Sequence, residues 1–156
     1  MATEIERKFL VLGDAWRASE GTRIWQGYLN RDKNRTVRVR VAGEQAFLTV
    51  KGATTGATRA EFEYDIPLAD AEQMLSMCDG PVIQKVRRLV QHDGFTWEVD
   101  EFFGENAGLV VAEIELQSEN QQFFKPSWVG REVTEDARYY NSNLATHPYA
   151  AWRDAA

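Results

Sequence analysis

The chain has 156 residues, 44% of them hydrophobic and 27% charged, which is an ordinary composition for one globular domain and excludes a disordered chain. A net charge of −6 and a pI of about 5.0 argue against nucleic acid as a partner, and no apolar run is long enough to cross a membrane. The N-terminal MATEIERKF lacks a signal-peptide core and the single Cys78 has no partner for a disulfide, so we expect a cytoplasmic protein.

Alternation of apolar and polar residues, which is typical of half-buried strands, predicts eight main strands separated by turn residues. These strands are Glu4–Val11, Arg23–Asn30, Arg35–Val41, Ala46–Lys51, Arg59–Ile66, Val82–Gln91, Phe95–Phe102 and Leu109–Gln117. Asp93-Gly94 between two of them is a strong signal for a tight hairpin.

The remaining chain predicts only a few other elements. Trp16 is expected in a short helix after the first strand, and a helix is expected over Leu68–Cys78 because its apolar residues share one face. A short strand around Val129–Val133 should precede a terminal helix near Asp136–Ala145. Short strands therefore dominate, which indicates a β-rich α+β domain.

Most of these strands place charged residues on one face and apolar residues on the other. The charged faces hold Glu4, Glu6, Lys8, Arg38, Arg40, Lys51, Glu61, Glu63, Lys85, Arg87, Glu98, Asp100, Glu113 and Glu115. The charges recur in blocks of like sign, as Glu-x-Glu, Arg-x-Arg and Lys-x-Arg. An open sheet with one solvated side is the simpler alternative, but such a face usually mixes signs and uncharged polar residues.

Closure of the strands into an antiparallel eight-stranded barrel accounts for both faces. We expect the apolar faces to point outward, under the helices and the C-terminal segment, and the charges to point into a tunnel. Clustered cations in such an interior favour a highly charged anion, and clustered carboxylates favour Mg²⁺ or Mn²⁺, which prefer oxygen ligands. A metal-bound polyphosphate would satisfy both groups.

Several stretches together resemble one family. The N-terminal Glu4-Ile-Glu6-Arg-Lys8-Phe resembles the Glu-x-Glu-x-Lys signature of the CYTH proteins, or triphosphate tunnel metalloenzymes. The likeness continues through Gln26-Gly-Tyr28-Leu, Val37-Arg-Val-Arg40, Leu48-Thr-Val-Lys51, Glu61-Phe-Glu63-Tyr, Lys85-Val-Arg87, Trp97-Glu-Val-Asp100-Glu-Phe, Ala112-Glu-Ile-Glu115-Leu, Gly130-Arg-Glu-Val-Thr-Glu-Asp136 and Tyr139-Tyr-Asn141. It covers nearly the whole chain, so we expect residues 1–156 to form a single CYTH domain.

The resemblance implies an eight-stranded tunnel and a metal-dependent hydrolase that splits inorganic triphosphate into pyrophosphate and phosphate. The opening Glu4-Ile-Glu-Arg-Lys-Phe-Leu10 looks most like that of short bacterial inorganic triphosphatases. Other members of the family act on thiamine or nucleoside triphosphates or cyclise ATP. A class IV-type adenylate cyclase and a thiamine or nucleoside triphosphatase therefore remain alternatives, and a non-catalytic polyphosphate-binding barrel is an alternative of another class.

The charged residues then receive expected roles. The cations assigned to the phosphate oxygens are Lys8, Arg38, Arg40, Lys51, Lys85 and Arg87. One or two Mg²⁺ or Mn²⁺ ions are expected on seven carboxylates. By the resemblance, Glu4, Glu6 and Glu115 would hold the first ion; Glu113, with Glu61, Glu63 or Asp100, could hold a second.

Lys85, Arg87 and Glu115 are expected to take part in the chemical step, with Lys85 orienting the attacking water or taking its proton. Glu63 and Glu98 are the members of the set that we most expect to form only ion pairs in the wall. The expected partner is a small triphosphate substrate, with neither nucleic acid nor a membrane, and the protein is expected to be a monomer or a homodimer.

Overall fold

The computed structural model describes residues 3–153, which contain nine strands, three α-helices and three short 3-10 helices. The strands are β1 (Thr3–Val11), β2 (Gly21–Asn30), β3 (Arg35–Ala42), β4 (Gln45–Gly52), β5 (Thr58–Asp65), β6 (Ile83–His92), β7 (Phe95–Phe102), β8 (Val110–Glu115) and β9 (Val129–Glu132). The helices are α1 (Leu68–Ser76), α2 (Asn141–Leu144) and α3 (Tyr149–Trp152), with 3-10 turns η1 (Ala15–Ala18), η2 (Gly104–Asn106) and η3 (Ala137–Tyr139). All eight predicted main strands and the predicted short strand are present, with small differences at their ends.

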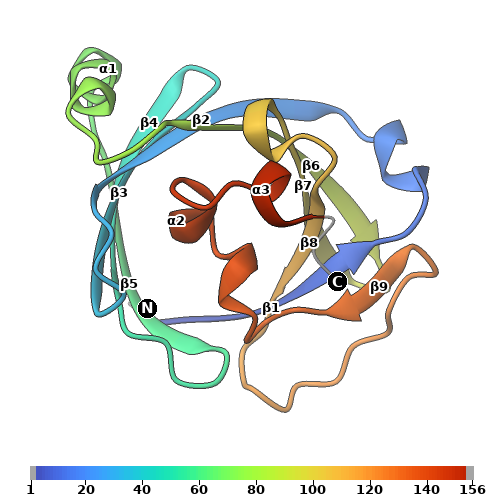
Figure 1. Ribbon diagram of the computed structural model, residues 1–156. Coiled ribbons are helices and arrows are strands. Elements are labelled where there is room, and N and C mark those ends of the chain that lie inside the picture. Colours follow the sequence, from blue (N-terminus) through green and yellow to red (C-terminus); the bar gives the residue numbers. More distant parts are fainter. Residues whose placement is uncertain (1–2, 154–156) are drawn as a thin grey trace.

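The strands form one antiparallel sheet that closes on itself (Figure 1). Its order is β5-β4-β3-β2-β6-β7-β8-β1-β9, and a further pairing of β1 with β5 completes an eight-stranded barrel. β1 makes this closure by changing partners along its length: Thr3–Ile5 pairs with β5, Glu6–Leu10 with β8, and its last residues with β9. The predicted closed barrel is thus confirmed.

The hairpin between β6 and β7 turns where the sequence predicted it. Asp93 and Gly94 both have positive φ angles, 52° and 81°, and two consecutive positive φ values define the type I′ turn that matches the twist of paired strands.

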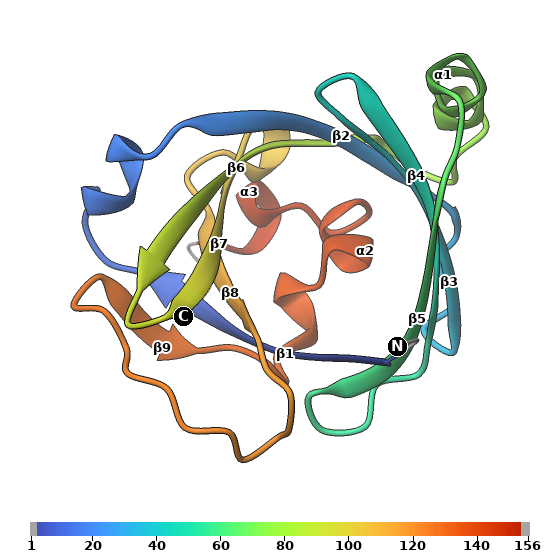
Figure 2. The same cartoon turned by 180° about the vertical axis from the view of Figure 1, so that it is seen from behind.

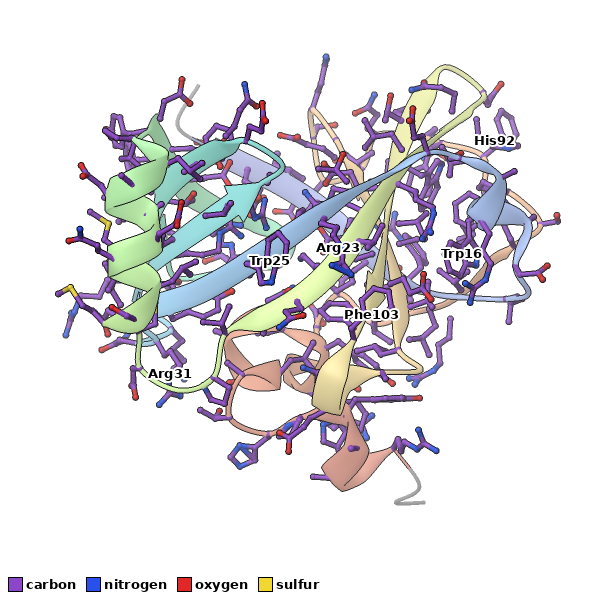
Figure 3. The ribbon with its side chains drawn as sticks, turned by 90° about the horizontal axis from the view of Figure 1, so that it is seen from above. Trp16, Arg23, Trp25, Arg31, His92 and Phe103 are labelled. Atoms are coloured by element: carbon purple, nitrogen blue, oxygen red, sulfur yellow. The ribbon has the colours of Figure 1, made fainter. Side chains whose placement is uncertain are left out.

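The outer apolar faces are covered by two separate segments. The helix α1 lies outside the barrel, where Ala71 is fully buried against Val39, Val41 and Ala46 (Figure 1). The connection between β8 and β9 covers a second outer area, where Phe123 and Trp128 pack edge-on against the ring of Trp97. Figure 3 shows Arg23 and Trp25 on the outer side of β2.

The C-terminal segment does not cover the outside of the barrel, and this expectation was wrong. The segment lies across one end of the barrel, as Figure 1 and the view from above in Figure 3 show. The reason lies in the inward-facing positions of three strands, which change from charged to apolar toward that end. On the same face, Ile83 stands two positions before Lys85, Phe102 two positions after Asp100, and Val111 two positions before Glu113.

These inward apolar residues form a core with Tyr139, Leu144 and Ala145. We call residues 137–152 the plug. It is not the single terminal helix predicted over 136–145, because Tyr140 has an extended conformation (φ −70°, ψ 133°) that separates η3 from α2. The view from behind in Figure 2 shows the plug through the ring of strands. None of the helices among residues 3–153 is long and apolar enough to span a bilayer.

Candidate active site

The barrel encloses a cavity of about 210 Å³ whose walls are mostly polar. The cavity is lined by all but one of the charged residues predicted to face the tunnel, namely Glu4, Glu6, Lys8, Arg38, Arg40, Lys51, Glu61, Glu63, Lys85, Arg87, Glu98, Glu113 and Glu115. The exception is Asp100, which lies behind the lining and is 1% exposed. Alternate residues of the strands therefore converge on one enclosed space, as the alternation of charged and apolar residues predicted.

One charge cluster lies where β1 and β5 close the barrel. The Lys51 ammonium is 3.1 Å from a Glu4 oxygen and 3.3 Å from a Glu61 oxygen, and Arg59 Nε donates to Glu4 at 3.0 Å. Burial alone would raise the pKa of Glu4, but the Lys51 and Arg59 cations outweigh burial and hold that pKa below its ordinary value. Burial and the neighbouring Glu4 charge raise the pKa of Glu61.

A second cluster is built on Asp100 of β7. Arg87 binds both Asp100 oxygens, at 2.8 and 2.9 Å, and the Lys85 ammonium lies 2.8 Å from one of them. The pKa of Asp100 is held well below its usual range, since these two cations outweigh the effect of burial. Arg87 also donates to Glu98 at 3.2 Å. The structure therefore makes Asp100 the anchor of two cavity cations and does not bring it to the cavity surface as a metal ligand.

Lys85 is the most buried cation of the site. Its side chain is 0% exposed, and burial lowers its pKa to about 7, with the Arg87 and Arg40 cations acting in the same direction and Asp100 opposing them. A lysine with such a pKa is partly neutral near pH 7, which makes it able to accept a proton there.

A third cluster lies where β1 faces β8. In the register of these strands Glu6 stands opposite Glu115, and Lys8 stands opposite Glu113, whose carboxylate is 3.6 Å from the Lys8 ammonium. Burial and the charges of Glu113 and Glu4 raise the pKa of Glu6 to about 8. Within residues 3–153, no cation forms an ion pair with Glu6 or Glu115.

Two acidic residues at paired strand positions, without cationic partners in the described residues, fit a divalent metal by their chemistry, since Mg²⁺ and Mn²⁺ take oxygen ligands and like charges on opposed residues are otherwise destabilising. Among the residues described, however, no three acidic side chains stand close enough together to form a ready metal site. Glu4 and Glu61 are held by Lys51, and Glu113 faces Lys8. All of the predicted metal ligands except Asp100 thus line one cavity, while most of the set, Asp100 included, form ion pairs with cations of the site.

The two arginines of β3 are held differently. Arg40 Nε donates to Gln26 Oε1 at 2.8 Å, and burial together with the Arg38 and Arg87 charges lowers the pKa of Arg40 to about 9. Arg38 reaches Thr49 at 3.4 Å and lies 3.8 Å from a Glu63 oxygen, but its buried Nε has no hydrogen-bond partner among residues 3–153. A buried donor left unpaired beside a cavity is what an anionic ligand would satisfy.

Several residues of the site were not among those predicted from the sequence. Arg59 precedes Glu61 by two positions, so the same alternation could have identified it. Tyr28, which belongs to one of the stretches that carry the resemblance, lines the cavity and also packs in the core beside the plug. Gln26 and Asn141 are uncharged, and only their place in the fold brings them to the charged residues.

The chain is similar to known proteins in sequence and in fold. Residues 2–149 match the CYTH domain family. The chain is 53% identical over 156 residues to an inorganic triphosphatase of Acetivibrio thermocellus, covering 99% of this chain and 100% of that protein. It is 37% identical over 147 residues to an inorganic triphosphatase of Nitrosomonas europaea, covering 92% and 97%. A solved structure described as an inorganic triphosphatase matches with a TM-score of 0.67 at 36% identity, covering 93% of this chain and 95% of that one.

Proposed function

Because this chain belongs to the CYTH domain family, we propose that it hydrolyses inorganic triphosphate to pyrophosphate and phosphate. The observation that carries the proposal is the enclosed cavity in which blocks of cations and blocks of carboxylates face each other. The activity named for two relatives, at 53% and 37% identity over nearly their full lengths, supports the choice of inorganic triphosphate among triphosphates.

The cations of the cavity bind the phosphate oxygens in this proposal. Arg38 is the best supported, because its buried Nε lacks a partner in the wall. We assign Lys8, Arg40, Lys51, Lys85 and Arg87 to the same role, and we add Arg59 to the set predicted from the sequence. Phosphoryl transfer depends mainly on positioning and charge stabilisation, and the two acidic anchors Glu4 and Asp100 hold four of these cations in place.

We assign Glu6 and Glu115, with Glu4 and Glu113 as neighbours, to holding Mg²⁺ or Mn²⁺. The facing pair without cationic partners supports this assignment, and Glu61 and Glu63 remain candidates for a second ion. When bound, such an ion would neutralise charge on the phosphates and make a bound water more acidic.

In the chemical step, water attacks the terminal phosphorus, a new P–O bond forms, and the bridging P–O bond breaks to release pyrophosphate. Lys85 orients that water or takes its proton, which its lowered pKa of about 7 permits. Arg87, fixed by Asp100 through two hydrogen bonds, stabilises charge on the transferred group. Glu115, which stands opposite Glu6, would help to hold the metal ion, and that ion would supply the charge neutralisation described above.

Phosphate release tests the proposal. The purified protein is offered tripolyphosphate, pyrophosphate, ATP and thiamine triphosphate, each with Mg²⁺, with Mn²⁺ and with a chelator. We expect metal-dependent release of phosphate and pyrophosphate, fastest from tripolyphosphate. Faster turnover of ATP to cyclic AMP would contradict the proposal, and so would tight binding of tripolyphosphate without any turnover.

A further inference from the structure

The plug makes direct polar contact with the cations of the cavity. The Asn141 side-chain oxygen accepts a hydrogen bond from the Lys85 ammonium at 2.9 Å, and the Tyr139 carbonyl lies 3.5 Å from the Lys8 ammonium. The ring of Tyr140 stands 5.5 Å from the same Lys8 group. Residues 139–141 therefore contact lysines from two different strands, β1 and β6.

We infer that Asn141 is a positioning residue of the reaction, because its side-chain oxygen holds the Lys85 ammonium from the plug side while Asp100 holds it from the barrel wall. The inference rests on the proposed function, in which Lys85 acts on the attacking water.

Lys85 is held by two acceptors that come from separate elements. Asp100 on β7 lies 2.8 Å from its ammonium and Asn141 on α2 lies 2.9 Å from it, and the ammonium also stands 5.4 Å from the ring of Phe102. An ammonium has three donors, so two fixed acceptors leave one N–H for a ligand in the cavity. Removal of one acceptor would free the ammonium to move with its flexible stem.

The same oxygen also joins Lys85 to a phosphate-binding candidate. Gln26 Nε2 donates to Asn141 Oδ1 at 2.9 Å, and Gln26 Oε1 accepts from Arg40 Nε at 2.8 Å. Gln26 is 0% exposed, and both ends of its amide are used. A continuous chain of hydrogen bonds thus runs from Arg40 through Gln26 and Asn141 to Lys85.

The position of Asn141 is fixed by the rest of the plug. Leu144 and Ala145 are buried in the apolar end of the barrel. Asn106 of η2 donates to the Leu144 carbonyl at 3.4 Å and accepts from the Tyr149 amide at 2.8 Å. Apolar packing and these two hydrogen bonds set where the Asn141 oxygen lies, so the plug supplies a fixed acceptor as well as a closed end.

The test compares Asn141→Ala with Asn143→Ala in the full chain, using tripolyphosphate and metal. Asn143 lies in the same helix, and its side chain donates to the Ala137 carbonyl within the plug, so it is a matched control. We expect Asn141→Ala to lower kcat about 10- to 100-fold, the usual effect of one hydrogen bond to a charged group, with KM changed by less than about threefold. Asn143→Ala should keep kcat within about twofold.

A double-mutant cycle with Gln26→Met tests the chain of hydrogen bonds from the barrel wall. If Gln26 and Asn141 act through one link, the double variant should be little worse than the worse single variant. Multiplicative effects of the two substitutions would overturn the link, and unchanged kcat in Asn141→Ala would overturn the positioning role. If Asn141→Ala does not fold, the kcat of Gln26→Met is the deciding measurement for the inference. A kcat equal to that of the parent protein overturns it.

A crystal structure of Asn141→Ala separates this inference from the proposed function. The Lys85 ammonium should move by about 1 Å or more, a displacement large enough to impair catalysis. An unmoved ammonium overturns the inference even if the parent is an active triphosphatase. An inactive parent would refute the proposed function, while the displacement would still decide whether Asn141 positions Lys85.

Discussion

Glu6 on β1 and Lys85 on β6 both line the cavity, and burial shifts their pKa values in opposite directions. The pKa of Glu6 rises from 4.5 to about 8, so between these values the folded state binds more protons than the unfolded state. Stability from this group is therefore lost as pH rises through that window. The pKa of Lys85 falls from 10.5 to about 7, so between these values the folded state binds fewer protons than the unfolded state. Stability from Lys85 is therefore lost as pH falls from 10.5 to about 7.

Replacement of Glu6 by Gln should separate stability from activity. In the presence of a chelator, the titration of Glu6 should lower the Tm of the parent protein between pH 5 and 8. The Tm of Glu6→Gln should fall less over this range, and at pH 8 this variant should have the higher Tm. Metal-dependent turnover should drop by about 10- to 100-fold or more, because a proposed metal ligand is lost. Thermal scans across pH and phosphate release measure both effects. Glu44→Gln, in an exposed turn, is the control, and a Glu6→Gln protein with normal turnover would refute the metal assignment.

Arg38→Ala should weaken substrate binding. Its unpaired Nε and its place in the cavity predict a fall in kcat/KM of about 10- to 100-fold, mostly through a higher KM. Arg23→Ala removes an arginine from the outer side of β2 (Figure 3) and should leave both constants unchanged. Steady-state kinetics with tripolyphosphate measure the difference. Equal behaviour of the two variants would remove Arg38 from the substrate site.

At the scale of elements, the strands of the sheet could be predicted well from the sequence. One rule, the alternation of apolar and polar residues, indicates both which face a residue takes and where a strand ends. The terminal helix was predicted wrongly because residues 136–145 carry apolar residues at suitable spacing, while the extended Tyr140 that interrupts them has no local signal. Asn141 and Gln26 could not be placed in the site from sequence, since an uncharged residue indicates no partner until the plug and the barrel wall are brought together.

The contact of α1 with β2 depends on a glycine. A Cβ added at Gly27 would lie 2.6 Å from the sulfur and 2.9 Å from the Cβ of Cys78, just after α1. Gly27→Ala should therefore destabilise the fold by about 1–3 kcal/mol, the usual cost of overpacking. Because α1 packs outside the barrel, kcat per folded molecule should not change. Denaturant unfolding together with kinetics below the transition measures both, and an unchanged free energy of unfolding would contradict the close packing.

At the scale of the whole molecule, the barrel places charges of both signs in one interior, and the ligand is expected to complete their pairing. Tripolyphosphate in the presence of a chelator, where no turnover is expected, should at about 100 times its Kd stabilise the fold by about 2.7 kcal/mol, visible as a rise in Tm. Orthophosphate at the same concentration should give a smaller rise, because it carries less charge into the cavity. The absence of any rise with tripolyphosphate would argue against a preformed anion site.

The closure made by β1 also bears on the order in which the chain can become functional during its synthesis. β1 is made before the other strands of residues 3–153, yet it pairs with β5, β8 and β9, and the last of these is made more than a hundred residues later. Pairings this distant along the chain form late. Glu6 and Lys8 must therefore remain without Glu115 and Glu113, their neighbours on β8, through most of translation, and a nascent chain that stops before β8 lacks the wall opposite them. The enzyme should thus acquire its activity in one late event, with no partly active precursor.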